Sequence, residues 1–97
     1  MTGSELSSAD LDPLQRKLLF RAWHRGIREM DLILGSFADA HIALMSELEI
    51  EEFGNLLEVS DRDLIKWFTG ESPVPADWDS PLFHKIKLHT RMTDRHI

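Results

Sequence analysis

The feature that most constrains the fold is the spacing of apolar residues, which recur every three or four positions along the chain. Such spacing places apolar side chains on one face of an α-helix, and no segment shows the alternation of a β-strand. Glycines and prolines interrupt the pattern at short intervals. The sequence therefore predicts an all-α fold: a compact five-helix bundle of short, mostly antiparallel helices.

The first two helices are separated at Gly26. Asp12 followed by Pro13 is typical of an N-cap with proline in the first turn, and Gly26 fits the left-handed residue that closes a helix. Glu29 and Asp31 fall in the first turn of the second helix, where negative charge suits exposed backbone N–H groups. The apolar face of the first helix is expected at Leu14, Leu18, Leu19, Ala22 and Trp23. That of the second is expected at Met30, Ile33, Leu34, Phe37, His41 and Leu44.

Three further helices follow. Residues 46–49, "SELE", form a capping box that opens the third. Ser60 caps the fourth, which Gly70 ends, and Ser80-Pro81 begins the fifth after a proline-stiffened loop. The inward residues expected here are Ile50, Phe53, Leu56, Leu57, Leu64, Ile65, Trp67, Phe68, Leu82, Phe83 and Ile86.

Two tryptophans and two glycines inside helices bear on packing. Trp23 and Trp67 lie near apolar faces, which favours core packing over an exposed interface role. Gly35 and Gly54 each cost about 1 kcal/mol relative to alanine in a helix, so we expect close helix–helix approach at both.

At 97 residues the chain can hold one modest core, so we expect a single domain over residues 13–92. Residues 1–12 would form a flexible N-terminal tail and residues 93–97 a C-terminal tail. The N-terminal segment has no basic residue and no apolar stretch of the kind that targeting peptides carry. Because no run approaches the roughly 18 apolar residues of a membrane span, we expect a cytoplasmic protein of bacterial type.

Little in the sequence suggests catalysis by the chain itself. There is no cysteine and no glycine-rich phosphate loop. His84 and His89 are five positions apart and diverge around a helix, while His41 fits a hydrogen-bonded core or boundary histidine. We therefore expect no metal site, no tightly bound cofactor and no catalytic residues.

Charge is unevenly distributed. The net charge of −6 argues against a general nucleic-acid binder. Residues 47–63 carry seven acidic side chains and one basic one, whereas five of the eleven basic residues fall within thirteen positions: Arg16, Lys17, Arg21, Arg25 and Arg28. A solvated helix face explains this basic stripe, and Arg25 with Glu29 would then be only a surface pair.

The segment "RAWHRGIREMD", residues 21–31, favours a second interpretation. Gly26 would break the helical register between Arg25 and Glu29, so the turn would offer a guanidinium, exposed backbone and a carboxylate in one patch. Planar arginine grips a partner carboxylate through two parallel hydrogen bonds. The turn is then a docking element, flanked by His24 and Arg28.

The stretch "RGIREMD", residues 25–31, resembles the Arg-Gly-x-x-Glu-x-Asp signature of the succinate dehydrogenase flavinylation factors. Residues 44–70, "LMSELEIEEFGNLLEVSDRDLIKWFTG", are also similar to that family, and the resemblance covers roughly residues 14–75. The chain departs from the family at His24, where a second arginine is common, and at Arg62, where proline is frequent.

The resemblance implies a five-helix assembly factor, not a catalyst. It would bind the flavoprotein subunit of succinate dehydrogenase, and that of the related fumarate reductase, and promote covalent attachment of FAD. The bond would form within the client, so FAD belongs to the client. We expect the factor to be a monomer without a membrane-inserted segment.

The signature also implies roles for individual residues. Arg25 would pair with a client carboxylate or polar loop, and Gly26 would permit a tight turn. Glu29 would orient Arg25 or accept a client donor. Asp31 would brace the second helix more than it contacts the client, while His24 and Arg28 would lie at the same contact.

Two other classes of protein stay open. One is a small helical DNA-binding or other interaction module unrelated to flavin, against which net acidity argues. The other is a protein that itself binds or transfers flavin, for which the chain shows no dinucleotide-binding motif.

Overall fold

The computed structural model describes residues 11–94, and of residues 91–94 only the backbone. Within this range the chain forms five α-helices and no strand, which confirms the all-α prediction. The helices are α1 (Pro13–Trp23), α2 (Arg28–His41), α3 (Glu47–Leu56), α4 (Asp61–Thr69) and α5 (Pro81–Asp94). Two short 3-10 helices, η2 (Ile42–Leu44) and η3 (Ala76–Trp78), lie in the connections.

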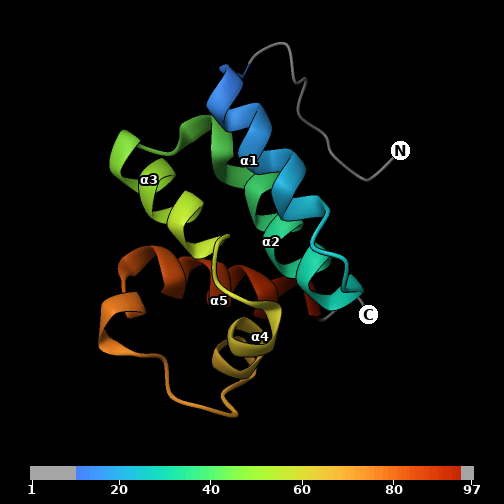
Figure 1. Ribbon diagram of the computed structural model, residues 1–97, viewed down its shortest axis with the longest axis vertical. Coiled ribbons are helices and arrows are strands. Elements are labelled where there is room, and N and C mark those ends of the chain that lie inside the picture. The colour runs from blue at the N-terminus through green and yellow to red at the C-terminus, as the bar shows by residue number, and fades with distance from the viewer. Residues whose placement is uncertain (1–10, 95–97) are drawn as a thin grey trace.

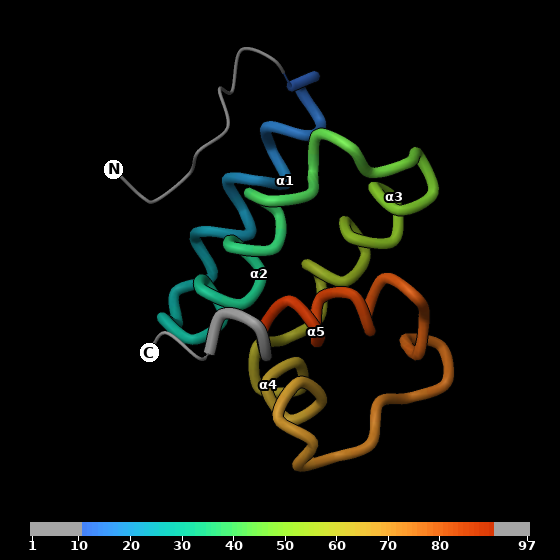
Figure 2. The backbone as a smooth tube through the Cα atoms, turned by 180° about the vertical axis from the view of Figure 1, so that it is seen from behind, coloured from blue at the N-terminus to red at the C-terminus, as the bar shows by residue number. Residues whose placement is uncertain are grey.

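The helices form two groups, α1 with α2 and α3, and α4 with α5 (Figure 1). α1 and α2 run antiparallel and side by side, as predicted, and α3 lies next to them. α5 runs across this group and packs on both α2 and α3, so it is not parallel or antiparallel to either. The view from behind shows α4 at the far end of the molecule from the start of α1 (Figure 2).

Side-chain caps mark where α1 and α3 begin. Asp12 Oδ1 accepts from the N–H of Gln15 at 2.8 Å, and Gln15 Oε1 accepts from the N–H of Asp12 at 2.9 Å. Ser46 and Glu49 form the same reciprocal pair at the start of α3. These bonds satisfy backbone donors that lack a partner at a helix start, and they confirm the predicted capping residues.

One hydrophobic core joins all five helices. Its buried residues are Leu11, Leu18, Leu19, Ala22, Met30, Leu34, Phe37, Ala38, Ile42, Ile50, Phe53, Leu56, Leu57, Leu64, Phe68, Leu82, Phe83 and Ile86. Nearly every predicted inward residue is buried in this set or packs against it. Trp23 and Trp67 are partly buried against the core, so the prediction of core packing is confirmed for both.

Three residues predicted on inward faces are exposed: Leu14, His41 and Leu44. Leu44 is 88% exposed because α2 ends at His41 and the following η2 turn changes the helical phase, which brings Ile42 inward instead. Leu14 is 52% exposed, and Leu11 supplies the buried side chain at this end of α1.

The limits of the domain differ slightly from those expected. Leu11, assigned to the N-terminal tail, is 3% exposed and belongs to the core. Helix α5 continues to Asp94, two residues past the expected end of the domain. The rest of the predicted tails, residues 1–10 and 95–97, lies outside the described residues.

The two helical glycines differ in their surroundings. A Cβ atom added at Gly35 would lie 2.3 Å from Cδ2 of the Trp23 indole, so α1 and α2 approach closely there as predicted. A Cβ at Gly54 would lie 3.7 Å from Leu18 Cδ2, which is an ordinary contact. Glycine is therefore required by packing at position 35 only, and the expectation of close approach at Gly54 is wrong.

This contrast predicts opposite effects of two matched substitutions. Gly35→Ala should lower the free energy of unfolding by about 1–3 kcal/mol, since the methyl group displaces the indole. Gly54→Ala should leave it unchanged or raise it by up to about 1 kcal/mol through helix propensity. Urea denaturation followed by tryptophan fluorescence measures both, and equal effects of the two would contradict the packing described.

Candidate functional site

The turn between α1 and α2 is built around Gly26. Its φ of +96° lies in the left-handed region, which side chains with a Cβ rarely adopt, and this confirms the conformation predicted for Gly26. The glycine does not itself close the first helix, because α1 ends at Trp23 with His24 as its C-cap. No heavy atom would lie within 4 Å of an added Cβ. Backbone conformation, not crowding, therefore requires glycine at this position.

Arg25 is directed into the molecule. Its side chain is only 10% exposed, and Nε donates to Asp61 Oδ1 at 2.8 Å. Nη1 donates to the carbonyl of Leu57, and Nη2 donates to the carbonyl of Val59 at 2.7 Å. These acceptors belong to the α3–α4 turn, residues 57–60, and the first residue of α4.

The expectation that the Arg25 guanidinium stands in solvent is therefore wrong. Carbonyl groups at the end of α3 carry partial negative charge and lack helical partners, and the planar guanidinium supplies donors in a matching fan. With the carboxylate of Asp61, which is 17% exposed, these groups compensate a largely buried cation. Arg25 fastens the α1–α2 turn to the α3–α4 turn.

Asp31 closes the same turn from its other end. Its Oδ1 accepts from the backbone N–H of Arg25 at 2.6 Å, across six positions of sequence. Asp31 thus joins the turn to the start of α2, while its share in client contact stays a prediction. The expectation that Glu29 orients Arg25 is not confirmed, because the hydrogen bonds of Arg25 within residues 11–94 go to Leu57, Val59, Asp31 and Asp61.

The remaining residues of the turn lie at the surface. The aromatic ring of Phe20, 61% exposed, stacks on the His24 imidazole with centroids 3.9 Å apart. Ile27 is 42% exposed. The structure thus brings together six exposed residues that we name the turn surface: Phe20, His24, Gly26, Ile27, Arg28 and Glu29.

Two parts of this site are not predicted by the sequence patterns. One is Phe20, which follows Lys17 on the outer face of α1, and the other is the α3–α4 turn as the partner of Arg25. The acidic bias of residues 47–63 was the available signal for the latter. Arg21, also in the basic stripe, forms an ion pair with Glu58 of this turn.

The histidines do not assemble a metal site in the described part of the chain. His41 is exposed at the edge of the core, and its ring lies 4.6 Å from that of Phe37 and 5.6 Å from that of His89. His89 Nε2 lies 2.9 Å from Ser36 Oγ. Burial, and secondarily the nearby His41, lowers the pKa of His89. The contact between His41 and His89 is not predicted by the sequence, because the two residues belong to different helices, α2 and α5, that are far apart along the chain.

The fold and the turn surface together define a small helical protein whose distinctive feature is a rigid, exposed turn. Residues 16–90 match the family described as flavinator of succinate dehydrogenase. The match covers most of the chain, so the protein belongs to this family. Membership does not favour the alternative of a DNA-binding module.

Individual relatives agree with this assignment. The FAD assembly factor of Acetobacter pasteurianus is 31% identical over 91 residues, which cover 94% of this chain and 84% of the relative. Mitochondrial succinate dehydrogenase assembly factor 2 of Dictyostelium discoideum is 29% identical over 83 residues, covering 86% of this chain and 59% of the relative. The protein of that name in Saccharomyces cerevisiae is 33% identical over 91 residues, which cover 90% of this chain and 56% of the relative.

The chain thus spans little more than half the length of these two mitochondrial relatives. No solved structure was found to match the chain. In the described part of the chain, no helix combines the length and the apolar character needed to cross a bilayer.

The contacts of Arg25 predict a large effect on stability. Arg25→Ala should lower the free energy of unfolding by about 2–4 kcal/mol, since it leaves Asp61 and two carbonyls without their donor. Arg28→Ala, three positions further on and exposed, should change it by less than about 0.5 kcal/mol. Urea denaturation distinguishes the two, and a small effect at Arg25 would contradict the anchoring role.

Proposed function

We propose that this protein is an assembly factor that binds the flavoprotein subunit of succinate dehydrogenase and promotes covalent attachment of FAD to that subunit. Membership of the flavinator family over residues 16–90 is the observation that carries the proposal. The names of the bacterial and mitochondrial relatives support it. The flavoprotein subunit of fumarate reductase is a further proposed client, on the strength of the sequence resemblance.

The turn surface is the proposed contact with the client. Phe20 and Ile27 offer apolar area, while Arg28 and Glu29 offer opposite charges beside it. Apolar anchors flanked by charged groups are typical of protein interfaces. Glu29 would accept a hydrogen bond from a client donor, and His24 would present its stacked ring.

The signature residues divide into two groups in this proposal. Gly26 and Glu29 face the client, whereas Arg25 and Asp31 act as positioning residues that hold the turn. A turn that is already ordered loses little conformational freedom on binding, which favours affinity. Arg25 thus supports client binding through its contacts with Leu57, Val59 and Asp61.

The protein would promote flavinylation by binding, without catalytic residues of its own. A helper shifts a client toward its reactive conformation only if it binds that conformation more tightly than the others. A preference of about 100-fold corresponds to roughly 2.7 kcal/mol. Monomeric state, cytoplasmic location and lack of nucleic-acid binding stay predictions of the sequence.

Glu29→Ala should separate binding from folding. Because Glu29 is exposed and makes no bond to Arg25, the variant should stay folded and lose at most about 1 kcal/mol of stability from the missing charge at the start of α2. It should nevertheless reduce the rate of client flavinylation by about tenfold or more. The client is incubated with FAD and the factor and then denatured, and the flavin that stays attached is measured by fluorescence.

The matched control for this test is Glu71→Ala, which removes an exposed carboxylate from the loop after α4. It should flavinylate the client like the wild type. If Glu29→Ala also does so, the turn surface is not the site of client contact.

The factor should bind FAD weakly or not at all, because FAD belongs to the client in this proposal. Titration of the isolated protein, followed by tryptophan fluorescence and calorimetry, should show no saturable binding in the nanomolar range. A stoichiometric nanomolar complex would instead favour a protein that carries flavin itself.

A further inference from the structure

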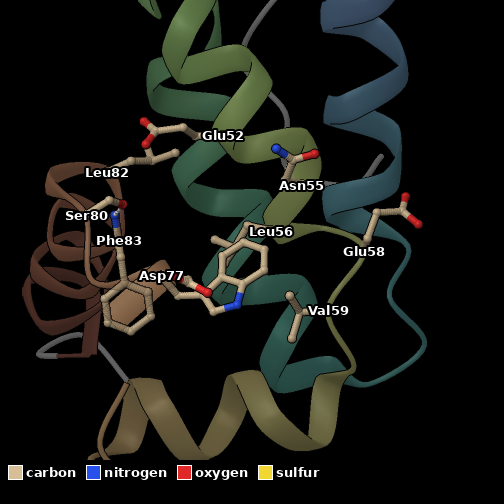
Figure 3. Close-up of a pocket in the computed structure, with 10 residues that line it drawn as sticks. Glu52, Asn55, Leu56, Glu58, Val59, Asp77, Ser80, Leu82 and Phe83 are labelled. Carbon is tan, nitrogen blue, oxygen red and sulfur yellow. Dashed lines mark hydrogen bonds between the residues drawn. The ribbon is translucent and has the colours of Figure 1, made fainter. Parts of the chain in front are cut away.

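A hollow of about 600 Å³ borders the α3–α4 turn. It lies between the end of α3, this turn and the segment that leads into α5 (Figure 3). Its apolar lining includes Leu56, Val59, Trp78 and Phe83. Leu56 and Phe83 belong to the core, so the floor of the hollow is fixed by the packing of the whole domain.

Trp78 contacts both the core and a second tryptophan. It is partly buried against the core, and its ring lies 6.2 Å from that of Trp67 with 31° between the ring planes. An indole face attracts a cation, and it attracts the flat guanidinium of arginine in particular.

The rim of the hollow is acidic. Glu52, Glu58 and Asp77 line it, and no basic residue does so within the described part of the chain. Figure 3 shows Glu52 beside Leu82 and Glu58 on the side nearest α1. Carboxylates around an apolar floor suit a side chain with an apolar stem and a cationic end.

The chain itself supplies an example of this chemistry at one edge. The Arg21 guanidinium forms an ion pair with the Glu58 carboxylate. Glu52 and Asp77, in contrast, form no ion pair with another described residue. Two rim carboxylates are thus available to a second cation.

We propose that this hollow is a docking site for an arginine side chain of the partner protein. The proposal rests on the proposed function, in which the partner is the flavoprotein subunit. Arginine fits better than lysine, because it stacks on an indole and bonds a carboxylate with two donors at once. The negative charge of the rim disfavours an acidic or polyanionic partner.

The hollow and the turn surface share one support. Val59 lines the hollow, and its carbonyl accepts from Arg25 Nη2. The guanidinium that holds the α1–α2 turn therefore also holds a wall of the hollow. A partner that contacts both sites meets them in a fixed relative position, so the second contact adds little ordering cost.

The first test uses the isolated protein and a model ligand, N-acetyl-arginine amide. Saturable binding at millimolar concentration should shift the indole N–H resonance of Trp78, assigned with Trp78→Phe. N-acetyl-citrulline amide, which has nearly the same shape without the charge, should not shift it. Equal shifts with the two ligands, or none with either, would overturn the proposal whether or not the protein assists flavinylation.

The second test uses the flavoprotein subunit. The double variant E52Q/D77N keeps the shape of the rim and removes two charges, so the Kd should rise about three- to tenfold. The difference should shrink between about 50 mM and about 200 mM salt. The control E71Q removes one exposed carboxylate outside the hollow and should bind like the wild type.

The other outcomes of the second test distinguish failure of the proposed function from failure of the docking proposal. If the wild type does not bind the flavoprotein subunit, the proposed function fails, and the ligand titration alone then decides on the hollow. If the subunit binds and E52Q/D77N matches the wild type at both salt concentrations, the proposed docking of arginine is wrong. If E52Q/D77N changes only self-association, measured by sedimentation, the occupant is a second copy of the chain and the proposal is equally wrong.

Discussion

The arrangement of the molecule depends on one largely buried cation. The Arg25 guanidinium joins the turn that separates α1 from α2 to the turn that separates α3 from α4, through two carbonyls and one carboxylate. The backbone N–H of Arg25 donates at the same time to the carboxylate of Asp31. A cation in such a place is tolerated only because each neighbouring acceptor needs a donor, so the two turns order each other.

This interaction changes what the Arg-Gly-x-x-Glu signature means physically. As a linear motif, the signature suggests that all of its side chains are exposed and contact a partner. In the folded chain the arginine faces inward, while the glycine and Glu29 face outward on a backbone that the arginine holds. In the proposed function, affinity for the client would then depend on how rigidly the turn is held as well as on which atoms touch the client. Loss of function at Arg25 is consequently expected through loss of structure.

Local sequence signals predicted the parts of the fold that depend on near neighbours. Capping boxes and the left-handed Gly26 involve residues within a few positions, and their chemistry is legible in the sequence. The partners of the Arg25 side chain are 32 to 36 positions away, and two of them are backbone carbonyls, which every residue type carries. The prediction that Leu44 faces the core is wrong for a related reason. α2 ends at His41, and the following 3-10 turn changes the direction of the side chains in a way that the apolar spacing does not reveal.

The central claim is that the turn surface meets the flavoprotein subunit of succinate dehydrogenase. The most direct measurement is photo-crosslinking with a benzophenone amino acid at Ile27, on the turn surface, and separately at Leu48, which is also exposed but lies on α3. The account predicts efficient crosslinking to the client from position 27 and little from position 48. Strong crosslinking from position 48 with none from position 27 would contradict it.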